Sequence, residues 1–210
     1  MNNVFWLPMG EIFETRNGYT PSKSNKDFWE NGSIPWFRME DIRLNGRILY
    51  DSIQHITPKA IKGNGLFKAN SIILATTATI GEHGLLTTDS LANQRFTNCV
   101  VRSSLATRLM PKFIYYYFFV IDEWCRQNIN VSSFPSVDMG KLKKQPFPIP
   151  SMEEQRRIVA ILDKFDILTT SISEGLPKEI RLRRKQYEYY RNELLSFPNN
   201  NSRYQQEEQQ

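Results

Sequence analysis

Four short segments combine cations, hydroxyls, side-chain amides and glycine, the groups that proteins use to bind nucleic acid. Phosphate oxygens accept hydrogen bonds from cations, hydroxyls and backbone N–H groups, whereas Asn, Gln and Arg side chains can read base edges. Taken singly, each segment could equally be a solvated turn. The segments are Arg16–Lys26, Thr76–Gly84, Asn93–Arg95 and Arg126–Ser133.

Within these segments we expect one set of side chains to contact nucleic acid. Lys23 and Lys26 would neutralise phosphates, and backbone amides near Gly18 would hold one. Asn93 and Gln94 suit adenine, and an arginine suits guanine. The full set is Arg16, Tyr19, Thr20, Ser22, Lys23, Lys26, Thr77, Thr79, His83, Asn93, Gln94, Arg95, Arg126, Ser132 and Ser133.

Residue patterns typical of catalysis are missing. The chain has no GxxxxGK[ST] or GxGxxG phosphate loop, no HExxH, no GxSxG and no Asn/Asp-Pro-Pro-aromatic methyltransferase motif. Glu82 and His83 could form an acid–base pair, but the flanking glycines predict a tight loop. Cys99 and Cys125 show neither a disulfide framework nor metal-ligand spacing. We therefore expect no enzyme activity and no metal site.

The positive charge lies in the first part of the chain. The 210 residues carry a formal charge of +5. Residues 1–150 hold 17 lysines and arginines against 12 acids, whereas residues 151–198 hold 9 against 8. Residues 1–150 also contain 20 of the 26 aromatic residues. A basic, aromatic-rich globule followed by a charge-balanced segment suggests a polyanionic partner for the globule.

The stretch Gln145–Pro150 reads as a linker between two domains, because its prolines exclude a helix interior. Ser151 then opens a capping box with Glu154. We expect a recognition domain over 1–150, a helical region over 151–197 and a disordered tail over 198–210. No apolar run is long enough to cross a bilayer, so we expect a cytoplasmic protein without membrane contact.

The helical region predicts two helices, each about 30 Å long, interrupted by Gly175 and restarted after Pro177. Their apolar residues recur with coiled-coil spacing. These seams could pack on each other as a hairpin or along a second copy, or the helices could only support the globule. The seam residues are Ile158, Ile161, Phe165, Leu168, Ile172, Ile180, Tyr187 and Leu194.

The first 150 residues predict a mixed, β-rich fold. Candidate strands are Ile34–Met39, Ile72–Thr77 and Phe96–Val101, and Lys112–Gln127 has the apolar spacing of an amphipathic helix. Four Asn-Gly pairs predict turns. The fold class is therefore α+β: a β-rich domain followed by a two-helix coiled-coil spacer. We expect the side chains of Trp29, Trp36, Phe37 and Trp124 in the core.

In order and spacing, the motifs resemble type I restriction–modification specificity subunits over about residues 4–197. Each motif is weak alone, and their succession carries the resemblance. In the globule they are Leu7–Phe13, Arg16–Ser22, Ile34–Trp36, Glu40–Ile42, Thr79–Gly81 and Leu91–Phe96. In the helices they are Pro148–Pro150, Glu153–Val159, Ile161–Phe165 and Arg183–Arg191.

The resemblance implies a non-catalytic protein that selects the double-stranded DNA sequence on which a methyltransferase acts. The globule would be a target recognition domain that reads one half of an interrupted site. The helices would fix the spacing and dock the modification subunits, and through them the restriction subunit. S-adenosylmethionine, ATP and Mg would then be bound in partner subunits, with no cofactor on this chain.

This chain has one recognition domain and one helical spacer, whereas the family usually carries two of each. A homodimer along the helical seams would restore two recognition domains, and its two-fold symmetry would require a palindromic interrupted site. A second specificity chain could replace that copy. The alternative reading is a non-functional or recombination-reservoir fragment of a specificity gene, folded but serving only as an interaction module.

Overall fold

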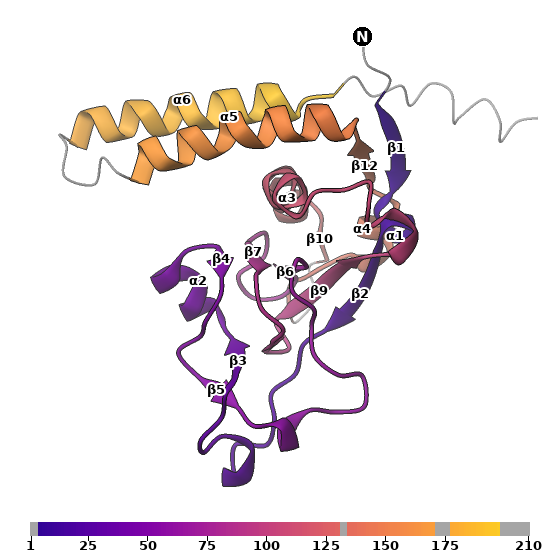
Figure 1. Cartoon of the computed structure of the whole chain (residues 1–210), viewed down its shortest axis with the longest axis vertical. Helices are drawn as coiled ribbons and strands as arrows, with labels where there is room; N and C mark the ends of the chain where they lie inside the picture. The colour runs from indigo at the N-terminus through magenta and orange to yellow at the C-terminus, as the bar shows by residue number, and fades with distance from the viewer. Residues whose placement is uncertain (1–3, 131–133, 171–176, 198–210) are drawn as a thin grey trace, which may run out of the picture.

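The computed structural model describes residues 4–130, 134–170 and 177–197, and side chains at 167–170, 177, 178 and 180 are not described. A β-rich body carries two long helices across one end (Figure 1). The helices are α1 (Met9–Ile12), α2 (Met39–Asn45), α3 (Pro111–Gln127), α4 (Met139–Lys144), α5 (Met152–Thr170) and α6 (Pro177–Leu195). Short 3₁₀ turns are η1 (Lys26–Phe28), η2 (Pro58–Ala60) and η3 (Ser103–Leu105).

Twelve strands in the described residues form four small sheets. The largest has the order β2-β9-β6-β7-β4 and is antiparallel except between β4 and β7. A three-stranded sheet has the order β5-β3-β8. The strands are β1 (Phe5–Pro8), β2 (Phe13–Asn17), β3 (Ile34–Phe37), β4 (Ile48–Leu49), β5 (His55–Ile56), β6 (Ile72–Ala75), β7 (His83–Leu86), β8 (Leu91–Ala92), β9 (Phe96–Val101), β10 (Ile129–Asn130), β11 (Ser136–Val137) and β12 (Pro146–Ile149).

The three predicted strands exist, and two of them end early. Phe96–Val101 is β9 as predicted. The strand that starts at Ile34 ends at Phe37, because the Asp41 carboxylate accepts a hydrogen bond from the Arg38 backbone N–H at 2.7 Å and α2 begins there. The strand from Ile72 ends at Ala75, three residues before Ala78, whose φ is +64°. The α+β class is confirmed.

Helix α3 is the central support of the body. It matches the predicted helix and starts with Pro111 in its first turn, where a missing N–H costs nothing. Its apolar side chains form one core with strands of the large sheet on one side and with α5 on the other. Phe113 and Phe118 are fully buried, and both contact Phe147 of β12.

The proline-rich stretch is a strand and not a linker. Strand β12 pairs antiparallel with β1, with Phe5 opposite Ile149 and Pro8 opposite Pro146. Proline is tolerated because this sheet has two strands, so each strand has an edge that needs no donor. The prolines were correctly taken to exclude helix, but the linker interpretation is wrong because Phe147 lies in the core. The division of the chain at residue 150 stays a prediction.

Helix α5 begins as predicted after Ser151, whose hydroxyl accepts a hydrogen bond from the Glu154 backbone N–H at 3.2 Å. The Glu154 carboxylate contacts Arg157 instead of reaching back, so only one half of the capping box is seen. The hydrogen bond from Arg157 lowers the pKa of the Glu154 carboxyl, and burial raises it. The hydrogen bond has the larger effect, so the pKa lies below its usual value.

Helices α5 and α6 pack side by side as a hairpin, as one of the three alternatives proposed (Figure 1). Phe165 of α5 stacks on Tyr190 of α6, with ring centroids 5.3 Å apart. Tyr187 and Leu194 pack against the core around α3. A second copy has little access to these side chains, because contacts within the chain already cover much of the seam.

Individual seam residues have different positions. Ile158 is fully buried in the core of the body, which fits the alternative in which the helix supports the globule and leaves this residue unavailable to a second copy. Ile161 is half-buried. The side chains of Leu168 and Ile180 are outside the described set, as are Ile172, the predicted helix end at Gly175 and the tail 198–210.

Candidate nucleic-acid interface

The first and third predicted segments lie against each other. The Thr20 hydroxyl donates a hydrogen bond to the Gln94 side-chain oxygen at 2.6 Å. The backbone N–H of Gly18 donates to the Phe96 carbonyl at 2.9 Å. A Cβ at Gly18 would lie 2.2 Å from the Asn93 carbonyl oxygen, so this approach requires glycine.

The second segment connects the third to the fourth. The Thr76 backbone N–H donates to the Arg95 carbonyl at 3.0 Å. The Arg126 guanidinium donates to the Gly81 carbonyl at 2.5 Å. Gly81 has a φ of +78°, and a Cβ there would lie 2.5 Å from the Asp122 carbonyl oxygen. Hydrogen bonds therefore link the segments 16–26, 76–81, 93–95 and 126–130 one to the next, and the side chains that they expose are called here the four-loop surface.

Several predicted side chains are exposed on this surface. Lys26 lies 3.7 Å from the Glu30 carboxylate, and Arg126 lies 2.9 Å from that of Glu123. Lys23 and Arg95 are exposed and form no ion pair with any residue that the structure describes. These two cations are therefore the most available for phosphate or base contacts.

Other members of the set are more enclosed. Arg16 is half-buried, donates to the Asn64 carbonyl and holds its guanidinium 4.8 Å from the Phe67 ring centroid. Burial lowers the pKa of Arg16 from its ordinary value. The Tyr19 hydroxyl donates a hydrogen bond to the Ala60 carbonyl at 3.1 Å and accepts one from the Lys62 backbone N–H at 2.9 Å. Tyr19 thus positions its neighbours.

The remaining polar members vary in how they are held. Ser22 is exposed and its hydroxyl lies 2.8 Å from that of Ser24. The Asn93 side-chain oxygen accepts from the Arg95 backbone N–H at 3.0 Å. Thr77 forms a β-bridge with Ser136. Thr79 is half-buried, and Ser132 and Ser133 lie outside the described residues.

The prediction that His83 contacts nucleic acid is wrong. Its side chain is 0% exposed, because residues 83–86 form strand β7 beneath α3 instead of the expected tight loop. Its Nδ1 lies 2.7 Å from an Asp122 carboxylate oxygen, which Arg47 also contacts at 3.1 Å. In the sequence, the adjacent apolar residues Leu85 and Leu86 were the signal that could have indicated this strand.

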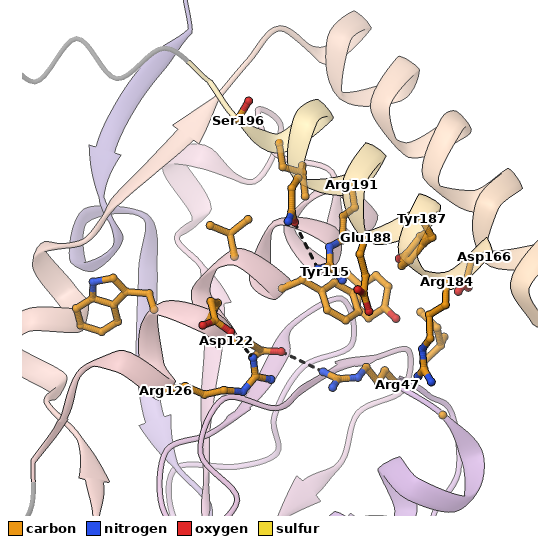
Figure 2. Close-up of a pocket in the computed structure, with 18 of the residues that line it drawn as sticks. Arg47, Tyr115, Asp122, Arg126, Asp166, Arg184, Tyr187, Glu188, Arg191 and Ser196 are labelled. Carbon is orange, nitrogen blue, oxygen red and sulfur yellow. Dashed lines mark hydrogen bonds and ion pairs between the residues drawn. The ribbon is translucent and has the colours of Figure 1, made fainter. Parts of the chain in front are cut away.

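Arg47 and Asp122 also belong to a cleft between α3, α6 and the turn from α2 to β4 (Figure 2). Its volume is about 1260 Å³. Four arginines and four acids line it, a balance that does not favour a polyanion. These are Arg47, Arg126, Arg184 and Arg191, and Asp122, Glu123, Asp166 and Glu188.

Sequence reasoning missed the cleft because its walls come from distant parts of the chain. Arg47 and Arg191 place their guanidinium carbons 5.0 and 4.9 Å from the centroid of the same ring, Phe119. Within the described ranges, no group of three or more His, Cys, Asp or Glu could hold a metal ion. No described helix is long and apolar enough to span a membrane.

Residues 6–182 match the family described as type I restriction modification DNA specificity domain. The chain is 53% identical over 201 residues to the Escherichia coli type I restriction enzyme EcoprrI specificity subunit, covering 92% of this chain and 50% of that protein. It is 40% identical to the E. coli EcoR124I/EcoR124II specificity subunit, covering 93% and 49%. The chain thus spans about half the length of these relatives.

Solved structures share the fold. The S subunit of a type I restriction-modification system from M. genitalium superposes with a TM-score of 0.57 at 16% identity, covering 82% of this chain and 41% of that one. The HsdS subunit from Thermoanaerobacter tengcongensis gives 0.62 at 17% identity, covering 92% and 45%. The family model over residues 6–182 and the two E. coli relatives show that the chain belongs to the type I restriction–modification specificity family.

Proposed function

We propose that this chain is a sequence-specific DNA-recognition subunit of a type I restriction–modification complex. The observation that carries the proposal is that hydrogen bonds bring four distant polar segments together, with two exposed cations, Lys23 and Arg95, that form no ion pair with a described residue. The relatives of known class support it. One such surface reads one half of an interrupted target.

In this mechanism the chain makes and breaks no bonds. Cations of the four-loop surface neutralise phosphates and fix the register, and Gln94, held by Thr20, presents its amide to a base edge. The chain thereby places the modification subunits on a chosen sequence in the cytoplasm. S-adenosylmethionine, ATP and Mg are bound by those partners and by the restriction subunit that they recruit.

Arg95→Ala and Lys23→Ala are expected to weaken the salt dependence of DNA binding. Each lost phosphate contact reduces the slope of log K against log salt by about 0.9. Fluorescence anisotropy of the chain with its modification subunits, measured from low to high salt, gives this slope. Arg156→Ala, an exposed position on α5, is the control and should leave the slope unchanged. Unchanged slopes in both loop variants would contradict the assignment.

A two-part target needs two recognition surfaces, supplied by a second copy or by another specificity segment. The described seam is largely covered within the chain, so pairing must use the outward face of the hairpin. Leu182 and Tyr189 of α6 are exposed and could pack against a second copy or the modification subunits. Two-fold pairing predicts a palindromic interrupted site.

Light scattering of the chain with its modification subunits is expected to show two copies per complex. Leu182→Asp with Tyr189→Asp should lower the mass, because buried charges destabilise an apolar contact. Tyr50→Asp, an exposed position near α2, is the control. A single copy in the wild-type complex at micromolar concentration would contradict homodimerisation.

Methylation-sensitive sequencing tests the function directly. Cells that carry the modification subunit should show a modified motif only when this chain is also present. A motif that is absent in both cases would instead support the alternative, a folded interaction module from an inactive specificity gene.

A further inference from the structure

The turn Lys62–Gly65 contacts the first segment of the four-loop surface, although it lies outside the segments that the sequence indicated for nucleic acid. Its residues are a cation, two glycines and an amide, the same combination as in those segments. The Gly65 backbone N–H donates a hydrogen bond to the Lys62 carbonyl at 2.9 Å, which closes the turn. Gly65 has a φ of +68°, a conformation that glycine adopts without strain. The turn predicted from the Asn64-Gly65 pair is therefore present.

Two side chains of the first segment hold this turn in place. The Tyr19 hydroxyl accepts a hydrogen bond from the Lys62 backbone N–H at 2.9 Å, which fixes the start of the turn. The Arg16 guanidinium donates to the Asn64 carbonyl, and it lies 4.8 Å from the Phe67 ring centroid. Arg16 is half-buried between these two groups. Its guanidinium therefore restrains the backbone of the turn at Asn64.

The side chains of the turn are available to an external ligand. Lys62 and Asn64 are exposed, and a Cβ added at Gly63 or Gly65 would meet nothing within 4 Å. Among the residues that the structure describes, the Asn64 side chain has no hydrogen-bond partner and Lys62 has no ion-pair partner. The Lys62 ammonium lies 4.6 Å from the Tyr19 ring centroid, a contact that leaves its charge without a counterion.

We propose that the turn Lys62–Gly65 is a further DNA-contacting element, in which Asn64 reads a base edge and Lys62 contacts a phosphate. An asparagine amide can pair with adenine through two hydrogen bonds. Such a pair needs an amide that is held in position, and Arg16 provides this restraint through the Asn64 carbonyl. Arg16 is then a positioning residue. The proposal rests on the proposed function and adds to it one named source of base specificity.

The composition of the turn favours DNA over a protein partner. Its four residues include no large apolar or aromatic side chain of the kind that anchors protein contacts. They offer one cation and one amide, which suit a phosphate and a base edge. If the turn instead contacts a modification subunit, loss of either side chain will weaken assembly.

The test uses the full chain with its modification subunits and the motif found by methylation-sensitive sequencing. Each base pair of the motif and its flanks is replaced in turn, and fluorescence anisotropy gives the affinity for each duplex. Asn64→Ala should lose at least about fivefold of the discrimination at one A·T pair, the low end for one bidentate contact, and keep it elsewhere.

Arg16→Lys tests the positioning role, because lysine keeps the charge but lacks the planar fork of the guanidinium. It should reduce discrimination at the same A·T pair. Arg16→Lys combined with Asn64→Ala should discriminate there no worse than Asn64→Ala alone, since both changes remove one interaction. A further loss at that pair in the double variant would overturn the positioning role.

Lys62→Ala tests the phosphate contact and should reduce the slope of log K against log salt by about 0.9. Base discrimination should stay as in wild type. Lys144→Ala is the matched control, because Lys144 is exposed on α4 and has no ion-pair partner among the described residues. The control should leave both the slope and the discrimination unchanged.

The outcomes separate this proposal from the proposed function. A wild-type complex without any preferred sequence would overturn the proposed function. A preferred sequence that Asn64→Ala discriminates as well as wild type does would overturn the base contact alone. Equal slopes for Lys62→Ala and Lys144→Ala would overturn the phosphate contact. Loss of modification subunits from either turn variant, seen by light scattering, would overturn the proposal and assign the turn to a protein contact.

Discussion

Asp122→Ala is expected to lower the free energy of unfolding by about 3 kcal/mol, the range for removing one partner of a buried charge pair. The Asp122 carboxylate is buried and contacts both His83 and Arg47. Its removal takes the carboxylate partner from the buried His83 ring and from the Arg47 guanidinium, which keeps its contact with the His83 carbonyl. Urea denaturation followed by tryptophan fluorescence measures the loss.

The neighbouring Glu123→Ala variant is the matched control. Glu123 is exposed, and its ion pair with Arg126 is of the surface type that contributes little. We therefore expect a much smaller change in the free energy of unfolding than for Asp122→Ala. A loss for Asp122→Ala no larger than that of Glu123→Ala would show that the buried network does not stabilise the fold.

Gln155→Leu is expected to cost about 3 kcal/mol or more, because several buried backbone groups lose their partner together. Gln155 is 0% exposed on α5. Its side-chain nitrogen donates to the carbonyls of Arg108 and Pro150 at 2.8 and 2.9 Å, and its oxygen accepts from the Met110 backbone N–H at 2.8 Å. Leucine has similar size but offers none of these bonds.

Cysteine reactivity at neutral pH measures the loss of stability that we expect for Gln155→Leu. Cys99 and Cys125 are buried, and desolvation raises the pKa of each thiol to about 12. The folded chain should therefore react slowly with iodoacetamide, and faster opening in Gln155→Leu should speed labelling. Arg156→Leu, an exposed neighbour, should label at the wild-type rate. Equal rates for both variants would contradict a stabilising role for Gln155.

Local patterns predicted the elements that have local causes. The apolar spacing after Pro111 predicted both ends of α3, and the cap at Ser151 predicted the start of α5, each within one residue. Gln145–Pro150 was misread because prolines signal a break locally, whereas pairing with β1, some 140 residues away in the chain, decides the structure. His83 was misread because its flanking glycines suggested a loop.

The candidate site was predictable only in parts. Each of the four segments has a composition suited to nucleic acid, but their convergence depends on tertiary contacts such as Thr20 with Gln94. The Arg47–Asp122 pair joins residues 75 apart in the sequence, and no local pattern indicates it.

The pairing of β1 with β12 also sets the order in which the chain can fold during synthesis. Phe5 of β1 cannot pair with Ile149 of β12 until Ile149 has been synthesised. At 5–20 residues per second, that interval is roughly 7–30 s. Phe13 of β2 likewise pairs with Val101 of β9. Such distant pairings slow folding, so β1 stays unpaired on the ribosome until β12 has been synthesised.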